Sequence, residues 1–425
     1  MAGLEVFHMA VFPYPVRSFV CRTYDAPVWE KMLRLDEAFY HPLCMYAGGV
    51  AGETGIPGLK LDFRAGLRLE VPKGAFHVCI SDGETGDAFF DDDVSETLLV
   101  SMEKYHRPWR VAVWQDGQMV FAHDFDIAGQ AVHIAFLTQS LGDVLAAMPS
   151  VAEFVETRRA QVTLAVPEYL EALVHFLFPQ IPLVQQVPQD AYAAFYIGNG
   201  NGEPHQLPVD GRSTPLELIP RIILGLEGAP PAPPEAIRAR LLAGPRPVRE
   251  PYVCINVQAS SAMKGWLWPH GWDEVIEALR GMGYRVLCID QEREQSDHGL
   301  TVRMPEGAED FTGSRPLVER AQFLAHAAFF IGLGSGLSWL AWMAGCPVVM
   351  IAGFSSPWYE FPEAERVWNP RVCHGCFNVT DTSFLMTPCP RFGEQSPQYM
   401  ECQRKIPPQM VLRAVGRIRA ALGEG

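Results

Sequence analysis

Basic residues are scarce in this sequence, and they do not cluster. Lysine and arginine number 34 against 49 aspartate and glutamate residues, which leaves a formal net charge of −15 over 425 residues. Because the phosphate backbone of a nucleic acid is bound by clustered Lys and Arg, this balance excludes a nucleic-acid partner. The start of the chain, MAGLEVFHMAVFPYPVRSF, also lacks the basic region of a signal peptide, and prolines interrupt its apolar stretch. We therefore expect a cytoplasmic protein.

One uncharged stretch is long enough to suggest a membrane span, which needs about 20 apolar residues. It covers residues 328–354, AFFIGLGSGLSWLAWMAGCPVVMIAGF. Glycines and a proline divide it into three shorter runs, which are typical of a buried strand, a helix and a second buried strand in a parallel sheet. We therefore expect no membrane span.

Most of the ten cysteines are isolated, which argues against a disulfide framework. Cys254 and Cys288, for example, lie in apolar runs, where a free thiol packs as a small apolar group. The exception is a C-x2-C-x12-C-x12-C segment. In a reducing compartment this crowding favours one tetrahedral metal site, for which zinc and iron are the usual ions, over four packed free thiols. The candidate ligands are Cys373, Cys376, Cys389 and Cys402.

Residues 1–130 consist of short alternating or aromatic runs separated by turn residues, which is typical of β-structure. Two of these runs flank Asp116 and Gly117, a pair that predicts a hairpin turn. The same region carries three consecutive aspartates at 91–93. Such carboxylates can hold a divalent metal with a nucleotide diphosphate, but short acidic runs are common in loops, so we favour an acidic turn.

From His133 onward, strand and helix patterns alternate along the chain. This alternation predicts parallel sheets covered by helices. A proline-rich linker at 226–236 separates two such series. We therefore expect two α/β domains, at 131–235 and 236–425, with a crevice between them.

Three strand-to-helix turns carry residues suited to an anionic ligand, and ligands of open α/β sheets bind at such turns. The first has an acid at a helix start, the second has hydroxyl groups and an ammonium, and the third is rich in glycine. Taken alone, each has an ordinary interpretation as a helix-start acid, a solvated loop or a site of tight packing. The residues are Asp143, then Ser260, Ser261 and Lys264, then Gly334, Ser335 and Gly336.

The order and spacing of these turns resemble those of bacterial heptosyltransferases of glycosyltransferase family 9. The matching segments are SLGDVLAAMP, S-x-x-K-G-W, DFTG and GLGSGLSWLAWMAGCPVV. GFSSPWYEFP and the four-cysteine segment further resemble the autotransporter heptosyltransferases, which transfer heptose to serines of autotransporter adhesins. The resemblance implies an α/β fold of GT-B type. Two Rossmann-like domains would face a cleft, with a β-rich N-terminal domain and a four-cysteine metal finger at 371–405.

The resemblance also implies roles for individual residues. Asp143 matches the catalytic base, which takes the proton of the acceptor hydroxyl. Lys264 matches a phosphate-binding lysine, and the two serines of its turn would lie beside it. The turn at 334–337 matches the segment whose backbone holds the diphosphate, and the DFTG turn matches a loop near the nucleotide. These last residues are Gly334, Ser335, Gly336 and Leu337, with Thr312 and Gly313 in the DFTG turn.

One departure concerns Gly334, because the lipopolysaccharide core enzymes carry an Asp at that place. It favours the autotransporter group. The chemistry implied is a single displacement with inversion, from ADP-heptose to a serine hydroxyl, in which fixed positive groups stabilise the leaving ADP without a catalytic Mg²⁺. The resemblance further implies one structural iron per chain, with zinc as the alternative, and a homo-oligomer, a dodecameric ring being the form found in relatives.

Two alternatives stay open at this point. One is a glycosyltransferase that uses a nucleotide sugar to modify lipopolysaccharide or another glycan, and the other is a non-catalytic binding or assembly subunit. Every catalytic interpretation requires that Asp143, from the first α/β domain, face the phosphate-binding turns of the second.

Overall fold

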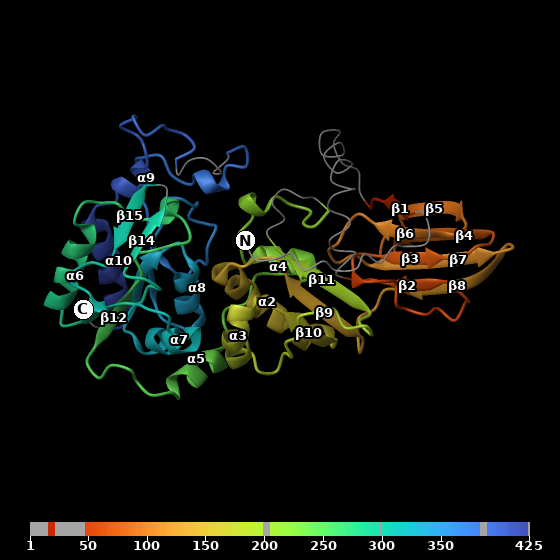
Figure 1. Cartoon of the computed structure of the whole chain (residues 1–425), viewed down its shortest axis with the longest axis horizontal. Helices are drawn as coiled ribbons and strands as arrows, with labels where there is room; N and C mark the ends of the chain where they lie inside the picture. Colours follow the sequence, from red (N-terminus) through yellow and green to blue (C-terminus); the bar gives the residue numbers. More distant parts are fainter. Residues whose placement is uncertain (1–15, 22–46, 199–204, 298, 383–388, 424–425) are drawn as a thin grey trace.

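The computed structural model describes residues 16–21, 47–198, 205–297, 299–382 and 389–423. Most of the segment interpreted above as lacking a signal peptide, residues 1–15, lies outside this range. Figure 1 shows a β-rich region, a small α/β unit and a larger α/β unit lying in a row along the long axis of the molecule.

The β-rich region contains two four-stranded sheets that share one apolar core. In the first, β1 pairs in parallel with β6, and all other pairs of both sheets are antiparallel. The predicted hairpin is confirmed, because Asp116 (φ 49°) and Gly117 (φ 78°) connect β7 to β8. The first sheet is ordered β1 (Val16–Phe19), β6 (Thr97–Ser101), β3 (Arg68–Val71) and β2 (Lys60–Asp62), and the second β5 (Ala88–Val94), β4 (Phe76–Asp82), β7 (Trp109–Gln115) and β8 (Gln118–Asp124).

The smaller α/β unit is built on a three-stranded parallel sheet, as the alternating pattern predicts. Its strands are mostly buried on both faces, which is why they read as continuous apolar runs. The sheet is ordered β10 (Gln161–Ala165), β9 (Ala131–Phe136) and β11 (Ala193–Ile197), and the helices are α2 (Leu141–Arg158), α3 (Glu171–Leu177) and α4 (Leu218–Leu224).

The larger α/β unit has a six-stranded sheet whose neighbouring strands are all parallel. The sheet is ordered β16 (Glu309–Asp310), β13 (Arg285–Cys288), β12 (Tyr252–Ile255), β17 (Phe330–Leu333), β18 (Val348–Ile351) and β19 (Glu365–Val367). Its helices are α5 (Glu235–Leu242), α6 (Gly271–Gly281), α7 (Leu317–His326), α8 (Gly336–Met343), α9 (Glu401–Arg404) and α10 (Pro408–Ala421), and β14 (Glu294–Asp297) pairs with β15 (Leu300–Arg303) as a separate antiparallel hairpin.

The uncharged stretch at 328–354 forms β17, α8 and β18, as predicted. Both strands are buried, and α8 is buried along most of its length. Within the residues that the structure describes, none of the helices has the length and apolar character needed to cross a bilayer.

Candidate active site

Helices α2 and α8, from the two α/β units, meet at their starts, and two glycines allow the contact. A Cβ atom on Gly142 would lie 2.9 Å from Cδ1 of Trp339 and 3.6 Å from Cα of Gly336. A Cβ atom on Gly336 would lie 2.9 Å from Cβ of Leu141. A side chain at either position would force its neighbours to move, so the two helix starts pack closely against each other. Because helix N-termini carry partial positive charge, their convergence favours an anionic ligand.

Asp143 occupies the third position of α2. Its Oδ2 atom accepts a hydrogen bond from the hydroxyl of Thr138 (2.9 Å), and its backbone N–H donates to the hydroxyl of Ser140 (3.4 Å), the N-cap residue. Burial raises the pKa of this carboxyl group, while the Thr138 hydrogen bond and the charge of Lys264 act in the opposite direction. A partly buried carboxylate with a raised pKa is a better proton acceptor than a fully exposed one.

Lys264, from the other α/β unit, is near enough for its charge to lower the pKa of the Asp143 carboxyl group. It ends a short 3-10 turn (Ala262–Lys264) that follows β12. Its backbone N–H donates to the carbonyl of Ser261 (3.1 Å), whose hydroxyl accepts from the N–H of Met263 (3.3 Å). Ser260 is exposed at the start of the same loop. The structure therefore brings two sequence candidates, Asp143 and Lys264, together across the two α/β units.

The glycine-rich turn between β17 and α8 supplies a third part of the site. Ser335 is the N-cap residue of α8, but its hydroxyl donates to Oδ1 of Asn256 (2.9 Å) and makes no hydrogen bond to the helix end. The helix start is instead left to Gly336 and Leu337, whose backbone amides have no partner within an α-helix. Gly336 lies beside Leu141 and Gly142 of α2, so the turn borders the same site as Asp143.

Asn256 and Asp290 are structural members of the site that the sequence analysis missed. Asn256 follows β12 directly and donates through Nδ2 to the carboxylate of Asp290 and to the carbonyl of Gln258 (2.6 Å). Asp290 also accepts from the backbone N–H of Val257 (2.9 Å), and burial raises the pKa of its carboxyl group despite these hydrogen bonds. Both residues stand at carboxyl ends of parallel strands, which is the signal that could have identified them.

Two tyrosines near Asp143 were missed as well. The pKa of Tyr169 is raised first by burial and then by the charge of Asp143, and the same two causes act on Tyr359. Tyr169 remains 55% exposed and donates its hydroxyl to the carbonyl of Gln139 (2.7 Å). Tyr169 comes from a 3-10 turn with no marked sequence signal, whereas Tyr359 lies within the GFSSPWYEFP segment, which gave no reason to single it out.

Gly334 has a structural reason to be glycine. A Cβ atom at this position would lie 3.0 Å from Oε1 of Glu360. The Glu360 carboxylate is buried, accepts a hydrogen bond from the hydroxyl of Ser355 (2.6 Å) and pairs with Arg366. A carboxylate contributed by a later loop thus stands next to the place where the core enzymes carry an Asp, and it leaves no room for a second one.

The DFTG turn lies at the same edge of the sheet but farther away. Thr312 donates its hydroxyl (2.6 Å) and its backbone N–H (3.0 Å) to Asp310, and Gly313 has a positive φ of 106°. The turn follows β16, and strand β13 separates β16 from β12. It is therefore less directly part of the site than Lys264 or the turn at 334–337.

The four predicted cysteine ligands line one small cavity of about 10 Å³, together with Met263 and residues of the surrounding loops. This is about the space that one small ion or water fills. Burial and the neighbouring thiols raise the pKa of Cys376 to about 11 and that of Cys402 to about 12. Four sulfur donors around a space of this size suit a single thiolate-binding ion.

The thiols are not arranged as metal ligands in the structure. Within the part of the chain that the structure describes, no group of three or more His, Cys, Asp or Glu side chains is arranged to hold a metal ion. His374 is not positioned as a further ligand, because its Nδ1 atom lies 2.8 Å from the carbonyl oxygen of Val372 and its ring packs on Trp368. The metal finger therefore stays a prediction.

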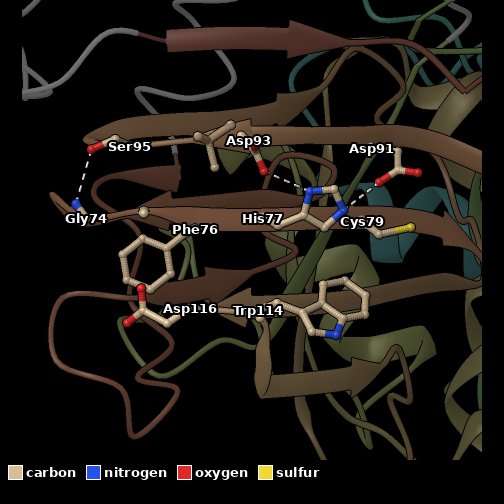
Figure 2. Close-up of a pocket in the computed structure, with 12 residues that line it drawn as sticks. Gly74, Phe76, His77, Cys79, Asp91, Asp93, Ser95, Trp114 and Asp116 are labelled. Atoms are coloured by element: carbon tan, nitrogen blue, oxygen red, sulfur yellow. Dashed lines mark hydrogen bonds and ion pairs between the residues drawn. The ribbon is translucent and has the colours of Figure 1, made fainter.

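The three aspartates at 91–93 do not form a turn, so that prediction is wrong. They lie in β5, where alternation turns Asp91 and Asp93 toward His77 of β4. Figure 2 shows the His77 ring between the two carboxylates, with Nε2 2.9 Å from Asp91 and Nδ1 3.0 Å from Asp93. Both ring nitrogens must donate, which requires an imidazolium, and the hydrogen bond to Asp93 is the main cause of the raised pKa of His77. These carboxylates are already bound, and the groove of about 800 Å³ that they border lies in the β-rich region, away from Asp143.

Comparison with known proteins identifies the family. The model of glycosyltransferase family 9 (heptosyltransferase) matches residues 230–382, and that of the N-terminal domain of glycosyltransferase TibC matches residues 55–117. The autotransporter heptosyltransferase BAHTCr of Citrobacter rodentium is 36% identical over 384 residues, which cover 87% of this chain and 91% of the relative. The chain belongs to the autotransporter heptosyltransferases. The resemblance predicted from the sequence is thereby confirmed.

A crystal structure and a further relative refine this assignment. The iron-containing dodecameric glycosyltransferase TibC of enterotoxigenic Escherichia coli superposes with a TM-score of 0.80 at 32% identity, covering 88% of this chain and 99% of that one. TibC has also been crystallised in complex with ADP-D-β-D-heptose. The α/β glycosyltransferase fold is thus confirmed. BimC of Burkholderia thailandensis, 32% identical over 86% of this chain and 87% of the relative, is described as an inactive autotransporter heptosyltransferase, so catalysis has to be argued from the site itself.

Proposed function

We propose that this chain is a protein O-heptosyltransferase, which transfers heptose from ADP-heptose to serine hydroxyl groups of an autotransporter adhesin. The observation that carries the proposal is the convergence of Asp143 with Lys264 and the turn at 334–337, from the two sides of the contact between α2 and α8. The nature of the donor is supported by the TibC complex with ADP-D-β-D-heptose, and that of the acceptor by the names of the relatives.

In the proposed reaction, Asp143 takes the proton of the serine hydroxyl while its oxygen bonds to the anomeric carbon. The bond from that carbon to the diphosphate oxygen breaks, and the electron pair leaves with ADP, so the configuration at the sugar inverts. Thr138 and the helix start orient the carboxylate. Lys264 and the backbone amides of the turn at 334–337 stabilise the charge that develops on the diphosphate, and for this reason the proposal includes no catalytic Mg²⁺.

The remaining nucleotide contacts are proposed on the same basis. Ser260 and Ser261 would bind the diphosphate beside Lys264, and Thr312 and Gly313 would border the nucleotide. We further propose the GT-B arrangement, with domains at 1–130, 131–235 and 236–425. In that arrangement the contact between α2 and α8 lies at the base of the cleft between the Rossmann-like domains.

We also propose that residues 371–405 form a finger that holds one structural iron ion, with zinc as the alternative. The support is the set of four thiols around one ion-sized cavity, and the description of TibC as iron-containing. Because thiolates repel each other in a buried space, a bound cation would relieve the burial cost that raises their pKa values. By analogy with TibC, the protein would form a dodecamer. As expected from the sequence, it would act in the cytoplasm.

The test is transfer by the purified protein from ADP-heptose to a serine-rich adhesin fragment, read as a mass increase of the fragment. Asp143→Asn should abolish transfer, whereas Asp124→Asn, which makes the same change at an exposed carboxylate of the β-rich region, should leave it intact. A mass increase on lipopolysaccharide alone would favour the glycan-modifying alternative. Absence of transfer and of ADP-heptose hydrolysis in the wild type would instead favour a non-catalytic role like that implied by the name of BimC.

A further inference from the structure

The finger at 371–405 touches the donor side of the proposed site through Gln403. This side chain follows the cavity-lining Cys402, is 3% exposed, and donates through Nε2 to the carbonyl of Met263. The carbonyl of Gln403 accepts in turn from the backbone N–H of Leu267 (3.0 Å). Met263 itself borders the thiol cavity and directly precedes Lys264. One glutamine thus connects a cavity cysteine to the turn that carries the phosphate-binding lysine.

The turn that Gln403 holds cannot be rigid by itself. Ala262–Lys264 is a single 3-10 turn, and short helical segments need tertiary contacts to persist. The bond from Gln403 and the packing of Met263 against the cavity are the contacts that the finger supplies. The finger therefore helps to place Lys264.

Arg212 binds the finger from the smaller α/β unit. Its Nε donates to the carbonyl of Phe377 (2.7 Å), Nη1 donates to that of Thr382 (2.9 Å), and Nη2 donates to that of Val379. Asn378 returns a hydrogen bond from Nδ2 to the carbonyl of Arg212 (2.6 Å). A guanidinium group that donates hydrogen bonds to several backbone carbonyl groups orders the segment to which these carbonyl groups belong.

The base of the finger is also joined to the loop that follows β18. The backbone N–H of Gly375 donates to the carbonyl of Gly353 (2.9 Å), and that of Ser356 donates to Oδ1 of Asn378 (2.7 Å). A side chain at Gly334 would point at this same loop, with Ser355 3.8 Å away. The finger therefore contacts the Lys264 turn, the loop beside the glycine-rich turn and the opposite α/β unit.

We propose that the finger is a positioning element of the donor site, in which metal retention and ADP binding are coupled through Gln403 and Arg212. Both are positioning residues, since Gln403 acts through Met263 on Lys264, and Arg212 holds the finger against the opposite unit. The inference rests on the proposed function for the role of Lys264 and for the metal. Because coupling between two sites is reciprocal, ADP should also slow the loss of the metal.

The test uses the full-length protein and two glutamine variants. Gln403→Leu removes the hydrogen bond to Met263 at nearly constant volume, and Gln398→Leu makes the same change at an exposed glutamine that borders the same cavity. Titration calorimetry with ADP should show about fivefold weaker binding for Gln403→Leu, the usual effect of one lost hydrogen bond, and unchanged binding for Gln398→Leu. Elemental analysis should find the same metal content in both variants and the wild type.

Two further measurements separate positioning from general stability. In a Lys264→Ala background, Gln403→Leu should have less than about a twofold further effect, because both changes remove the same contact to ADP. Saturating ADP should slow release of the metal to a chelator by at least about fivefold in the wild type and not in Arg212→Met. These rates are measurable even if Gln403→Leu folds poorly.

The inference is overturned if metal-loaded Gln403→Leu binds ADP like the wild type, if its effect persists in full without Lys264, or if ADP leaves the rate of metal release unchanged. Failure of the proposed function has a different signature. In that case the wild type itself would bind no ADP or contain no metal, and both proposals would be rejected together.

Discussion

Replacing Gly142 with alanine should separate the two helices that form the proposed active site. The added Cβ atom would lie 2.9 Å from the ring of Trp339, where carbon atoms prefer about 3.5 to 4.0 Å. The Trp339 ring cannot yield easily, because it packs against Trp342 (ring centroids 5.4 Å apart) and Phe361 (4.8 Å). The helices must therefore move apart by about 0.5 to 1 Å to restore normal contact.

This displacement has two measurable consequences. Overpacking of this kind typically costs about 1–3 kcal/mol, which exceeds the gain of up to about 1 kcal/mol that alanine brings to a helix. Asp143 would also move away from Lys264 and the turn at 334–337. A misplacement of about 1 Å can lower a catalytic rate about a hundredfold, so we expect kcat to fall by one to two orders of magnitude.

Gly416→Ala in α10 is the matched control. This glycine is exposed, and a Cβ atom there would meet nothing within 4 Å. The substitution should therefore stabilise the protein by about 0.5–1 kcal/mol and leave kcat unchanged. Calorimetric unfolding measures the change in stability, and the transfer assay measures kcat. If Gly142→Ala proved as stable and as active as Gly416→Ala, the close contact between α2 and α8 would be wrong.

Gly334→Asp should destabilise the protein, because the new carboxylate would meet that of Glu360. Adding Glu360→Gln should restore part of the lost melting temperature. If it restored none, the position of Glu360 beside residue 334 would be wrong. Asp143→Asn should raise the melting temperature at pH 7 while lowering kcat by about a hundredfold or more. The expected stabilisation follows from the raised pKa of Asp143 in the folded state. Above that pKa the carboxylate is charged, and the charged form lowers the stability of the folded protein. The difference in melting temperature between the Asn variant and the wild type should therefore shrink as the pH falls through that pKa. An Asn variant less stable than the wild type at pH 7 would refute this. Cys376→Ser should yield metal-poor, less soluble protein by elemental analysis, whereas Cys79→Ser in the β-rich region should keep its metal; a metal-replete Cys376→Ser would remove that thiol from the ligand set.

Much of the fold could be predicted because its signals are local. Strands β11, β12, β17 and β18 of the two parallel sheets are buried on both faces, so each appears in the sequence as a short apolar run between turn residues. The hairpin at Asp116 and Gly117 is set by the positive φ angles that these two residues tolerate. The aspartates at 91–93 lie in a strand because their segment pairs with β4, where Asp91 and Asp93 bind His77, and this long-range pairing outweighs their own turn preference.

By itself, the sequence determined the class of most elements of the two α/β units, the position of Asp143 at a helix start, and the candidate phosphate-binding turns. These depend on neighbouring residues and on the rule that parallel sheets bind ligands at their carboxyl ends. Only the tertiary structure decided which of them meet. Three contacts join distant segments of the chain. Gly142 contacts Trp339, the carboxylate of Glu360 lies beside Gly334, and Arg212 donates hydrogen bonds to the finger. Such contacts are set by packing after the chain has folded back on itself, and no local propensity encodes them.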